Sequence, residues 1–210
     1  MRRKTIKYII NILLIIIIVF LSLDIHPLDS ERKRPVSEVF DVEEYVADLW
    51  TDQLPEVFSN APEISNLLGL FNDDPEAAFD RYSRKLGISN THYFYVSGMG
   101  TVDAIDETTV HLTVNGNIPV ELETVYVFGN AIRDGSGLVE IDEFQNMMDF
   151  NMVSARLNRL VKSNVIDPFR NEVRPGHIVF FTGASEINRR EPIPDRLNII
   201  PVQTEIRHGE

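Results

Sequence analysis

The residues best suited to bind a ligand lie in a short glycine-rich loop, RDGSG, at positions 133–137. Its glycines let the backbone approach a bound molecule, and the Arg133 guanidinium beside Asp134 is able to bind a carboxylate or sugar hydroxyl groups. We therefore expect Arg133, Asp134 and Ser136 to contact a ligand. In the alternative, Arg133 and Asp134 form a buried or half-buried ion pair that stabilises a turn. The loop lacks the lysine and the spacing of a phosphate-binding loop.

A second polar group follows this loop, in or beside an amphipathic helix expected over about residues 142–167. Asp142 with Gln145 resembles a capping box, which places the helix start there. Asn146 and Asp149 are able to hydrogen-bond a sugar where the helix meets the strands, so we include both as candidate ligand-binding residues. Such side chains also commonly satisfy the backbone next to them, and this alternative stays open.

Signs of catalytic or metal chemistry are sparse. The chain has no cysteine, which excludes disulfides, thiol catalysis and a lipidated N-terminal cysteine. The histidines lack metal-ligand spacing, and no serine stands in a G-x-S-x-G sequence. A glycan hydrolase remains an alternative if two of Asp134, Asp142 and Asp149 lie about 5–10 Å apart in a cleft. We predict no metal, no cofactor and no identified catalytic residue, and we favour a binding protein over an enzyme.

The charge of the chain restricts its partners. It carries 20 basic and 32 acidic residues, a net charge of −12. Arg2, Arg3, Lys4 and Lys7 all lie at the extreme N-terminus, so the rest of the chain is more acidic still. Such a body repels a phosphate backbone, and we predict no nucleic-acid partner. The hydrophobic share of 43% is typical of a globular protein.

Residues 1–25 have the pattern of an export signal, in which a basic flank precedes an apolar run from Tyr8 to Leu23. The run is slightly shorter than the roughly 20 residues of an average spanning helix. No small-residue cleavage site follows it. We expect an uncleaved transmembrane anchor in the inner membrane with the soluble domain in the periplasm; cleavage and secretion is the alternative. A charged linker with two prolines, residues 26–38, follows the anchor.

The remaining chain predicts an α+β fold. Amphipathic segments between residues 39 and 90 indicate a small helical subdomain. Residues 91–206 predict three strands, the helix near 142–167 and two further strands, with Asn115-Gly116 as a hairpin turn. Five short strands with a helix between the third and the fourth is the arrangement of an OB-type barrel. Pro201 in the last strand implies an edge position or a break.

Several segments together resemble a known bacterial family: the N-terminal anchor, FDVEEYVADLW, IRDGSGLVEIDEFQN…VSARLN and the closing GHIVFFTGA…NIIPV. This uncharacterised family contains predicted periplasmic lipoproteins of unknown function, and the resemblance covers most of residues 39–204. It implies a helical subdomain with an OB-like barrel. Members are often associated with sugar transport systems of the ATP-binding-cassette type, which implies an accessory role. The absence of cysteine departs from the lipoprotein description.

The sequence therefore predicts an extracytoplasmic binding or accessory protein, tethered to the membrane by its N-terminal helix. Its expected partner is a sugar or a transporter protein. Two alternatives remain: a hydrolase that acts on a glycan of the envelope, and a structural envelope component that holds other proteins.

Overall fold

The structure is a computed structural model that describes residues 40–125, 127 and 129–207. From Phe40 onward the chain forms one compact unit. The predicted anchor (1–25) and linker (26–38) lie outside the described residues. Within the described part, no helix is both long and apolar enough to cross a bilayer.

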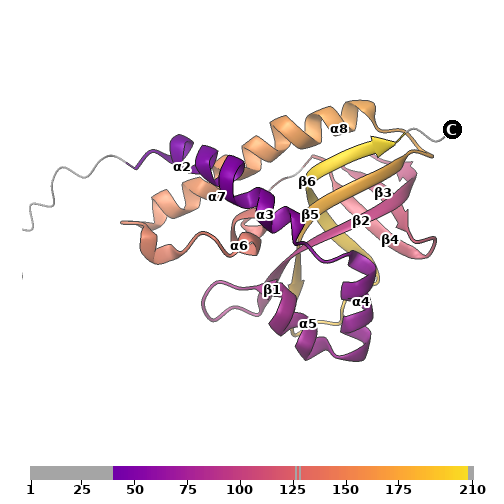
Figure 1. The fold of residues 1–210 in the computed structure, drawn as a ribbon, viewed down its shortest axis with the longest axis horizontal. Helices are drawn as coiled ribbons and strands as arrows, with labels where there is room; N and C mark the ends of the chain where they lie inside the picture. Colours follow the sequence, from indigo (N-terminus) through magenta and orange to yellow (C-terminus); the bar gives the residue numbers. More distant parts are fainter. Residues whose placement is uncertain (1–39, 126, 128, 208–210) are drawn as a thin grey trace, which may run out of the picture. The chain divides into compact units, whose positions relative to one another are not determined.

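The strands close into a barrel, as the sequence predicts (Figure 1). Its strand order is β2-β3-β4-β6-β5, and pairing between β5 and β2 completes the ring. β4 and β6 run parallel, while the other pairs in the ring are antiparallel. The strands are β2 (Thr91–Ile105), β3 (Thr109–Val114), β4 (Ile118–Glu123), β5 (Ile178–Asn188) and β6 (Leu197–Arg207).

Strand β2 belongs to both sides of the barrel because it is long, at 15 residues. It pairs with β5 from Thr91 to Thr101 and with β3 from Gly100 to Ile105. Near its start it also pairs with the short strand β1 (Ser83–Arg84). The register of β2 with β3 shifts between Val102 and Ala104.

The predicted hairpin turn between β3 and β4 is confirmed. Asn115 and Gly116 both have positive φ angles, 51° and 78°. The amide of Asn117 donates to the Val114 carbonyl at 3.2 Å. Asparagine and glycine tolerate this left-handed backbone better than other residues do, so the dipeptide fixes the hairpin register.

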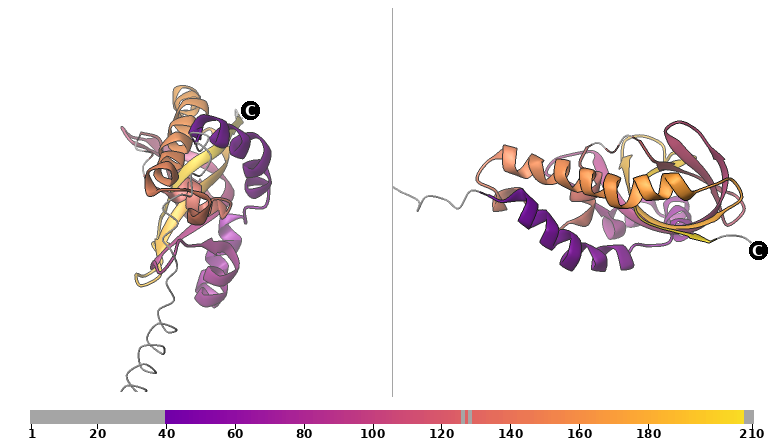
Figure 2. Two further views of the ribbon diagram at one scale, coloured as in Figure 1. Left: turned by 90° about the vertical axis from the view of Figure 1, so that its left-hand side faces the viewer. Right: turned by 90° about the horizontal axis from the view of Figure 1, so that it is seen from above.

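The helices are divided between two apolar cores. The first fills the barrel and includes side chains from α4 (Ile64–Asp73), α5 (Pro75–Tyr82) and α8 (Asp167–Glu172). The second lies beside the barrel (Figure 2). It is formed by α6, α7 and the continuous helical run over residues 42–59, which we call the first helical rod. The helices expected as one subdomain over residues 39–90 thus contribute to different cores. The elements of the second core are α2 (Val42–Asp48), the π-helical turn η1 (Leu49–Gln53), α3 (Leu54–Ser59), α6 (Ala131–Ser136), α7 (Met147–Val161) and the π-helical turn η3 (Lys162–Ile166).

The helix predicted over residues 142–167 begins later and ends later than expected. A 3-10 turn, η2 (Ile141–Glu143), comes first, and the continuous run α7–η3–α8 extends from Met147 to Glu172. The predicted cap at Asp142 is wrong, because the Asn146 side chain caps α7 by accepting from the Asp149 amide at 2.9 Å. The backbone of Phe144 is extended, with φ −105° and ψ 141°, so the helix cannot continue through it, and its ring packs edge-on against Phe40.

The break predicted at Pro201 does not occur, because β6 runs continuously from Leu197 to Arg207, but its register with β5 shifts there. Pro201 lies opposite Gly183, and the register shifts between Thr182 and Gly183. A Cβ atom on Gly183 would lie 2.3 Å from Ile199 Cγ2 and 2.6 Å from the Ile200 carbonyl oxygen. The close approach of the two strands therefore requires glycine at this position.

We predict that Gly183→Ala destabilises the barrel by about 1–3 kcal/mol, the usual cost of overpacking. For a chain of this size, that corresponds to a fall in Tm of roughly 2–12 °C. Thermal unfolding followed by circular dichroism measures the change. Gly69→Ala in α4 is the control, since no atom lies within 4 Å of its added Cβ and alanine favours helix. An unchanged Tm for Gly183→Ala would contradict the close strand contact.

Candidate functional site

The glycine-rich loop predicted to bind a ligand forms α6, and its charged pair is buried. Arg133 is 1% exposed. Its Nε donates to Asp134 Oδ1 at 2.7 Å, and its Nη1 donates to the Phe150 carbonyl at 2.9 Å. The guanidinium also lies over the Phe150 ring, 3.6 Å from its centroid. This geometry corresponds to the alternative weighed from the sequence, an ion pair that supports a turn.

The other predicted ligand-binding residues also make local hydrogen bonds. The buried Ser136 hydroxyl donates to the Arg133 carbonyl at 2.6 Å. Asn146 Nδ2 donates to Asp149 Oδ2 at 2.8 Å on the exposed first turn of α7. Since Arg133, Asp134 and Ser136 are buried, Asn146 is exposed and Asp149 is half-buried, the structure does not present them as one binding surface. Their contact with a ligand stays a prediction.

The carboxylates considered for hydrolysis are only partly brought together. Asp134 and Asp142 line one cavity of about 480 Å³, and Asp149 does not. Asp134 is already paired with the buried Arg133 guanidinium, which makes it a poor candidate for proton transfer. Among the residues that the structure describes, no group of three or more potential ligands is arranged to hold a metal ion.

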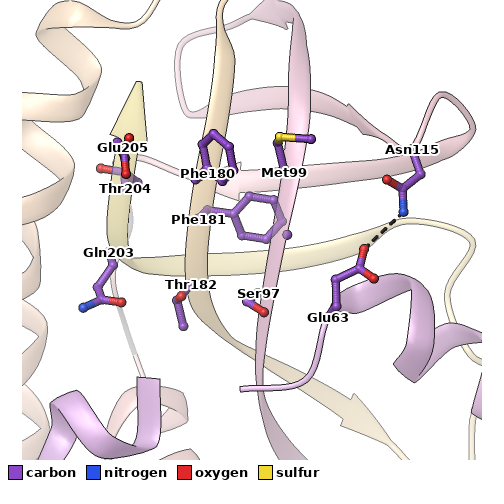
Figure 3. A pocket seen from close by; sticks show the side chains of 11 residues that line it. Glu63, Ser97, Met99, Asn115, Phe180, Phe181, Thr182, Gln203, Thr204 and Glu205 are labelled. Atoms are coloured by element: carbon purple, nitrogen blue, oxygen red, sulfur yellow. Dashed lines mark hydrogen bonds between the residues drawn. The ribbon is translucent and has the colours of Figure 1, made fainter. Parts of the chain in front are cut away.

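A different feature stands out as a candidate site: a groove of about 670 Å³ along β2, β5 and β6 (Figure 3). Apolar side chains lie in the middle of the view and polar ones flank them. We call this feature the strand groove. It is lined by Glu63, Ser97, Gly98, Met99, Asn115, Phe180, Phe181, Thr182, Gln203, Thr204 and Glu205.

The strand register explains how these residues meet. Met99 pairs with Phe180, and Ser97 pairs with Thr182. Residues two apart on a strand point to the same face, so these two rows lie side by side. Met99 is 45% exposed, which displays a large apolar side chain to solvent.

Gly98 opens the floor of the strand groove. It lies opposite Phe181, and a Cβ atom at Gly98 would lie 2.8 Å from Phe181 Cζ and 3.2 Å from Ile64 Cγ2. Without a side chain at position 98, the Phe181 ring reaches across the neighbouring strand toward Ile64. Phe181 is only 3% exposed and belongs to the barrel core, so it forms the floor of the groove, while Met99 and the half-buried Phe180 supply its accessible apolar surface.

Hydrogen bonds fix one rim of the groove. Asn115 Nδ2, from the β3–β4 turn, donates to Glu63 Oε1 at 3.1 Å. The Ser97 hydroxyl donates to the Ala61 carbonyl at 3.0 Å, and this joins the segment before α4 to β2. On the opposite side, the Arg207 guanidinium lies 4.3 Å from the centroid of the Phe180 ring. The result is an apolar surface between polar rims, which suits a molecule with one apolar face and several hydroxyl groups.

The face formed by β3 and β4 has a different character, because its charged groups are already paired. His111 Nε2 lies 2.8 Å from Asp106 Oδ2, and its Nδ1 lies 3.4 Å from Glu121 Oε1. Arg196 Nη1 lies 2.6 Å from the same Glu121 oxygen. The pKa of Asp106 is lowered to about 2. The largest cause is the hydrogen bond with His111, and the backbone N–H groups of Thr108 and Thr109 add to it.

The strand-groove residues were not predicted as a site from the sequence. The available signals were the Gly-Met-Gly triplet at 98–100 and the Phe-Phe pair at 180–181. Each is ordinary strand sequence when taken alone. Only the pairing of β2 with β5 places Met99 beside Phe180.

The closed five-stranded barrel with its intervening helix defines an OB-fold protein. The structure is similar to a solved OB-fold protein from Thermotoga maritima MSB8, with a TM-score of 0.71 and 25% sequence identity, over 80% of this chain and 99% of that one. A family model described as predicted periplasmic lipoprotein (DUF2291) matches residues 13–205, and the chain belongs to this family. Membership assigns it to the cell envelope, outside the cytoplasm. No curated protein matches the chain.

We predict that Asp134→Ala lowers the free energy of unfolding by about 3–5 kcal/mol, because it leaves the buried Arg133 guanidinium without a counter-charge. The double variant Arg133→Met/Asp134→Ala should be less destabilised than the sum of the single variants. Urea unfolding followed by circular dichroism measures both.

The exposed pair Lys162–Asp167, at 2.7 Å, is the control for this prediction. Lys162→Met should cost less than about 1 kcal/mol, as exposed ion pairs usually do. Equal losses for Asp134→Ala and Lys162→Met would contradict a structural role for the buried pair.

Proposed function

We propose that this protein is an extracytoplasmic binding module whose strand groove holds a neutral saccharide. The observation that carries the proposal is the accessible apolar surface of Met99 and the half-buried Phe180, which lies between hydroxyl, amide and carboxylate side chains. A sugar ring has an apolar C–H face, which packs on such side chains, and hydroxyl groups at its edge, which hydrogen-bond to the polar rims. The groove volume of about 670 Å³ lies within the range of about 300–1,000 Å³ common for small-molecule sites.

Charge supports a neutral ligand. Glu63 and Glu205 line the groove, and the whole chain has a net charge of −12. Both disfavour a polyanion such as a nucleic acid. OB folds bind oligosaccharides as well as oligonucleotides, so the saccharide is the class that agrees with both the fold and the charge.

The proposal extends to where the module works. The apolar run Tyr8–Leu23 anchors it in the inner membrane, and it serves as an accessory protein to a sugar transporter of the ATP-binding-cassette type. Support comes from the basic flank before the run and from the sugar-compatible groove. Cell fractionation and co-purification of the full chain test this extension. Recovery in a soluble cytoplasmic fraction would overturn the anchoring, and absence of a transporter subunit would overturn the accessory role.

A structural interaction protein is the second candidate, because one specific surface favours it. Ile141, Met147 and Met148 are exposed around the start of α7, and Met148 is 72% exposed. An apolar surface of this kind suits a protein partner. Cross-linking in intact cells from a cysteine placed at Met148 would capture this partner, and capture independent of the strand groove would favour the second candidate.

Calorimetry of the full chain in detergent micelles, with glucose, galactose, maltose and cellobiose as probes, tests saccharide binding. We expect at least one of these sugars to bind. Met99→Ala should weaken that binding about tenfold, because it removes several apolar groups from contact with the sugar.

Met148→Ala is the matched control, since it removes the same side chain from an exposed position outside the groove. It should leave the affinity unchanged. Absence of binding by all four sugars, or equal effects of the two methionine variants, would overturn the saccharide proposal.

A further inference from the structure

A second cavity, of about 630 Å³, lies between the first helical rod and the glycine-rich loop. Two carboxylates line it from η1 and α3, those of Asp52 and Glu56. Two guanidinium groups line it from α5 and β1, those of Arg81 and Arg84. We call it the charged cavity, because its lining carries both signs of charge. It shares no lining residue with the strand groove.

The charges of this cavity do not neutralise one another. Ion pairs within 4.0 Å occur elsewhere in the described chain, and none of them includes these four side chains. Arg84 Nη1 donates to the Ser83 carbonyl at 3.1 Å, and the Arg81 guanidinium lies 5.1 Å from the centroid of the Tyr82 ring. Neither contact balances the positive charge. Carboxylates and guanidinium groups thus line one hollow without contacting each other.

The glycine-rich loop places one of the guanidinium groups. Gly137 ends α6 with a φ of +65°, and a Cβ atom there would lie 2.8 Å from Arg84 Nε and 3.0 Å from Arg84 Cδ. The Arg84 side chain therefore lies against the Gly137 backbone, whose positive φ favours glycine. A hydrogen bond from β2 fixes the position of this loop, since the Tyr95 hydroxyl donates to the Ile132 carbonyl at 2.8 Å. The buried Arg133–Asp134 pair lies in the same short helix.

We propose that the charged cavity binds a short peptide by its two free termini. The peptide carboxylate contacts Arg81 and Arg84, because guanidinium groups bind carboxylates with charge-assisted hydrogen bonds. The peptide ammonium group contacts Asp52 and Glu56. All four charged residues are exposed, and the opposite charges lie more than 4.0 Å apart. A ligand with opposite charges at its two ends contacts the carboxylates and the guanidinium groups at the same time. The volume suits a peptide of two or three residues rather than a long chain.

Calorimetry of the full chain in detergent micelles tests the proposal with three probes: trialanine, N-acetyl-trialanine and trialanine amide. Trialanine should bind. Each blocked peptide should bind about tenfold more weakly or worse, because it loses the charge-assisted hydrogen bonds of one terminus. No binding of trialanine, or equal binding of the three probes, would overturn the proposal. Tighter binding of inorganic phosphate than of trialanine would overturn it in favour of an anion site.

Two variants test which side chains contact each terminus of the peptide. Arg84→Gln should weaken trialanine binding about tenfold and reduce the difference between trialanine and its amide, since only Arg81 then remains to contact the carboxylate. Glu56→Gln should do the same for trialanine and its N-acetyl form. Arg190→Gln and Glu107→Gln are matched controls at exposed positions outside the cavity, and both should leave binding unchanged.

Circular dichroism verifies that each variant is folded. A folded Arg84→Gln variant with unchanged affinity would overturn the proposal. If a variant fails to fold, the comparison of free and blocked peptides on the unmodified chain still decides the question. Loss of peptide binding in Arg84→Gln should leave saccharide binding in the strand groove intact, which separates this proposal from the proposed function.

Discussion

The pairing of β2 on both of its edges is the constraint on which the rest of the structure depends. This strand pairs with β5 over Thr91–Thr101 and with β3 over Gly100–Ile105. It must therefore curve from one side of the barrel to the other. Closure removes open sheet edges, which are otherwise sites of unwanted strand addition. It also places Ser97 and Met99 beside Thr182 and Phe180, which makes the strand groove a consequence of barrel closure.

The alternation of side chains along β2 also joins the two apolar cores. Phe94 and Val96 point into the barrel, whereas Tyr95 between them points into the helical core. Burial raises the pKa of the Tyr95 hydroxyl, which remains a hydrogen-bond donor to the Ile132 carbonyl. The helices beside the barrel are thereby attached at the strand that closes it. The run α7–η3–α8 makes a second connection, because Ile166 lies in the helical core and Phe169 in the barrel core.

Features encoded by neighbouring residues were predictable from the sequence. Asn115-Gly116 specifies its turn whatever surrounds it, and the Asp41 side chain caps α2 by accepting from the amides of Glu43 and Glu44 at 2.9 and 3.2 Å. The closed barrel followed from five short strand segments with a helix after the third. The boundary at Met147 did not, because Phe144 has an extended backbone and its ring packs against Phe40, which is distant in sequence.

The candidate site was harder to predict for a related reason. An Arg-Asp pair in a glycine-rich loop has the same local sequence whether it faces a ligand or a core. Here Phe150 decides between the two, since its ring and carbonyl both contact the Arg133 guanidinium. The strand groove depends on the register between β2 and β5, and sequence periodicity specifies which face a residue takes but not which partner lies opposite.

The saccharide proposal is tested most directly by amide NMR shifts of the labelled full chain in micelles, with glucose, galactose, maltose and cellobiose each added to saturation. With at least one of these sugars we expect shifts centred on Ser97–Met99, Phe180–Thr182 and Gln203–Glu205. Shifts centred on the β3–β4 face around His111, or no shifts at all, would contradict the proposal.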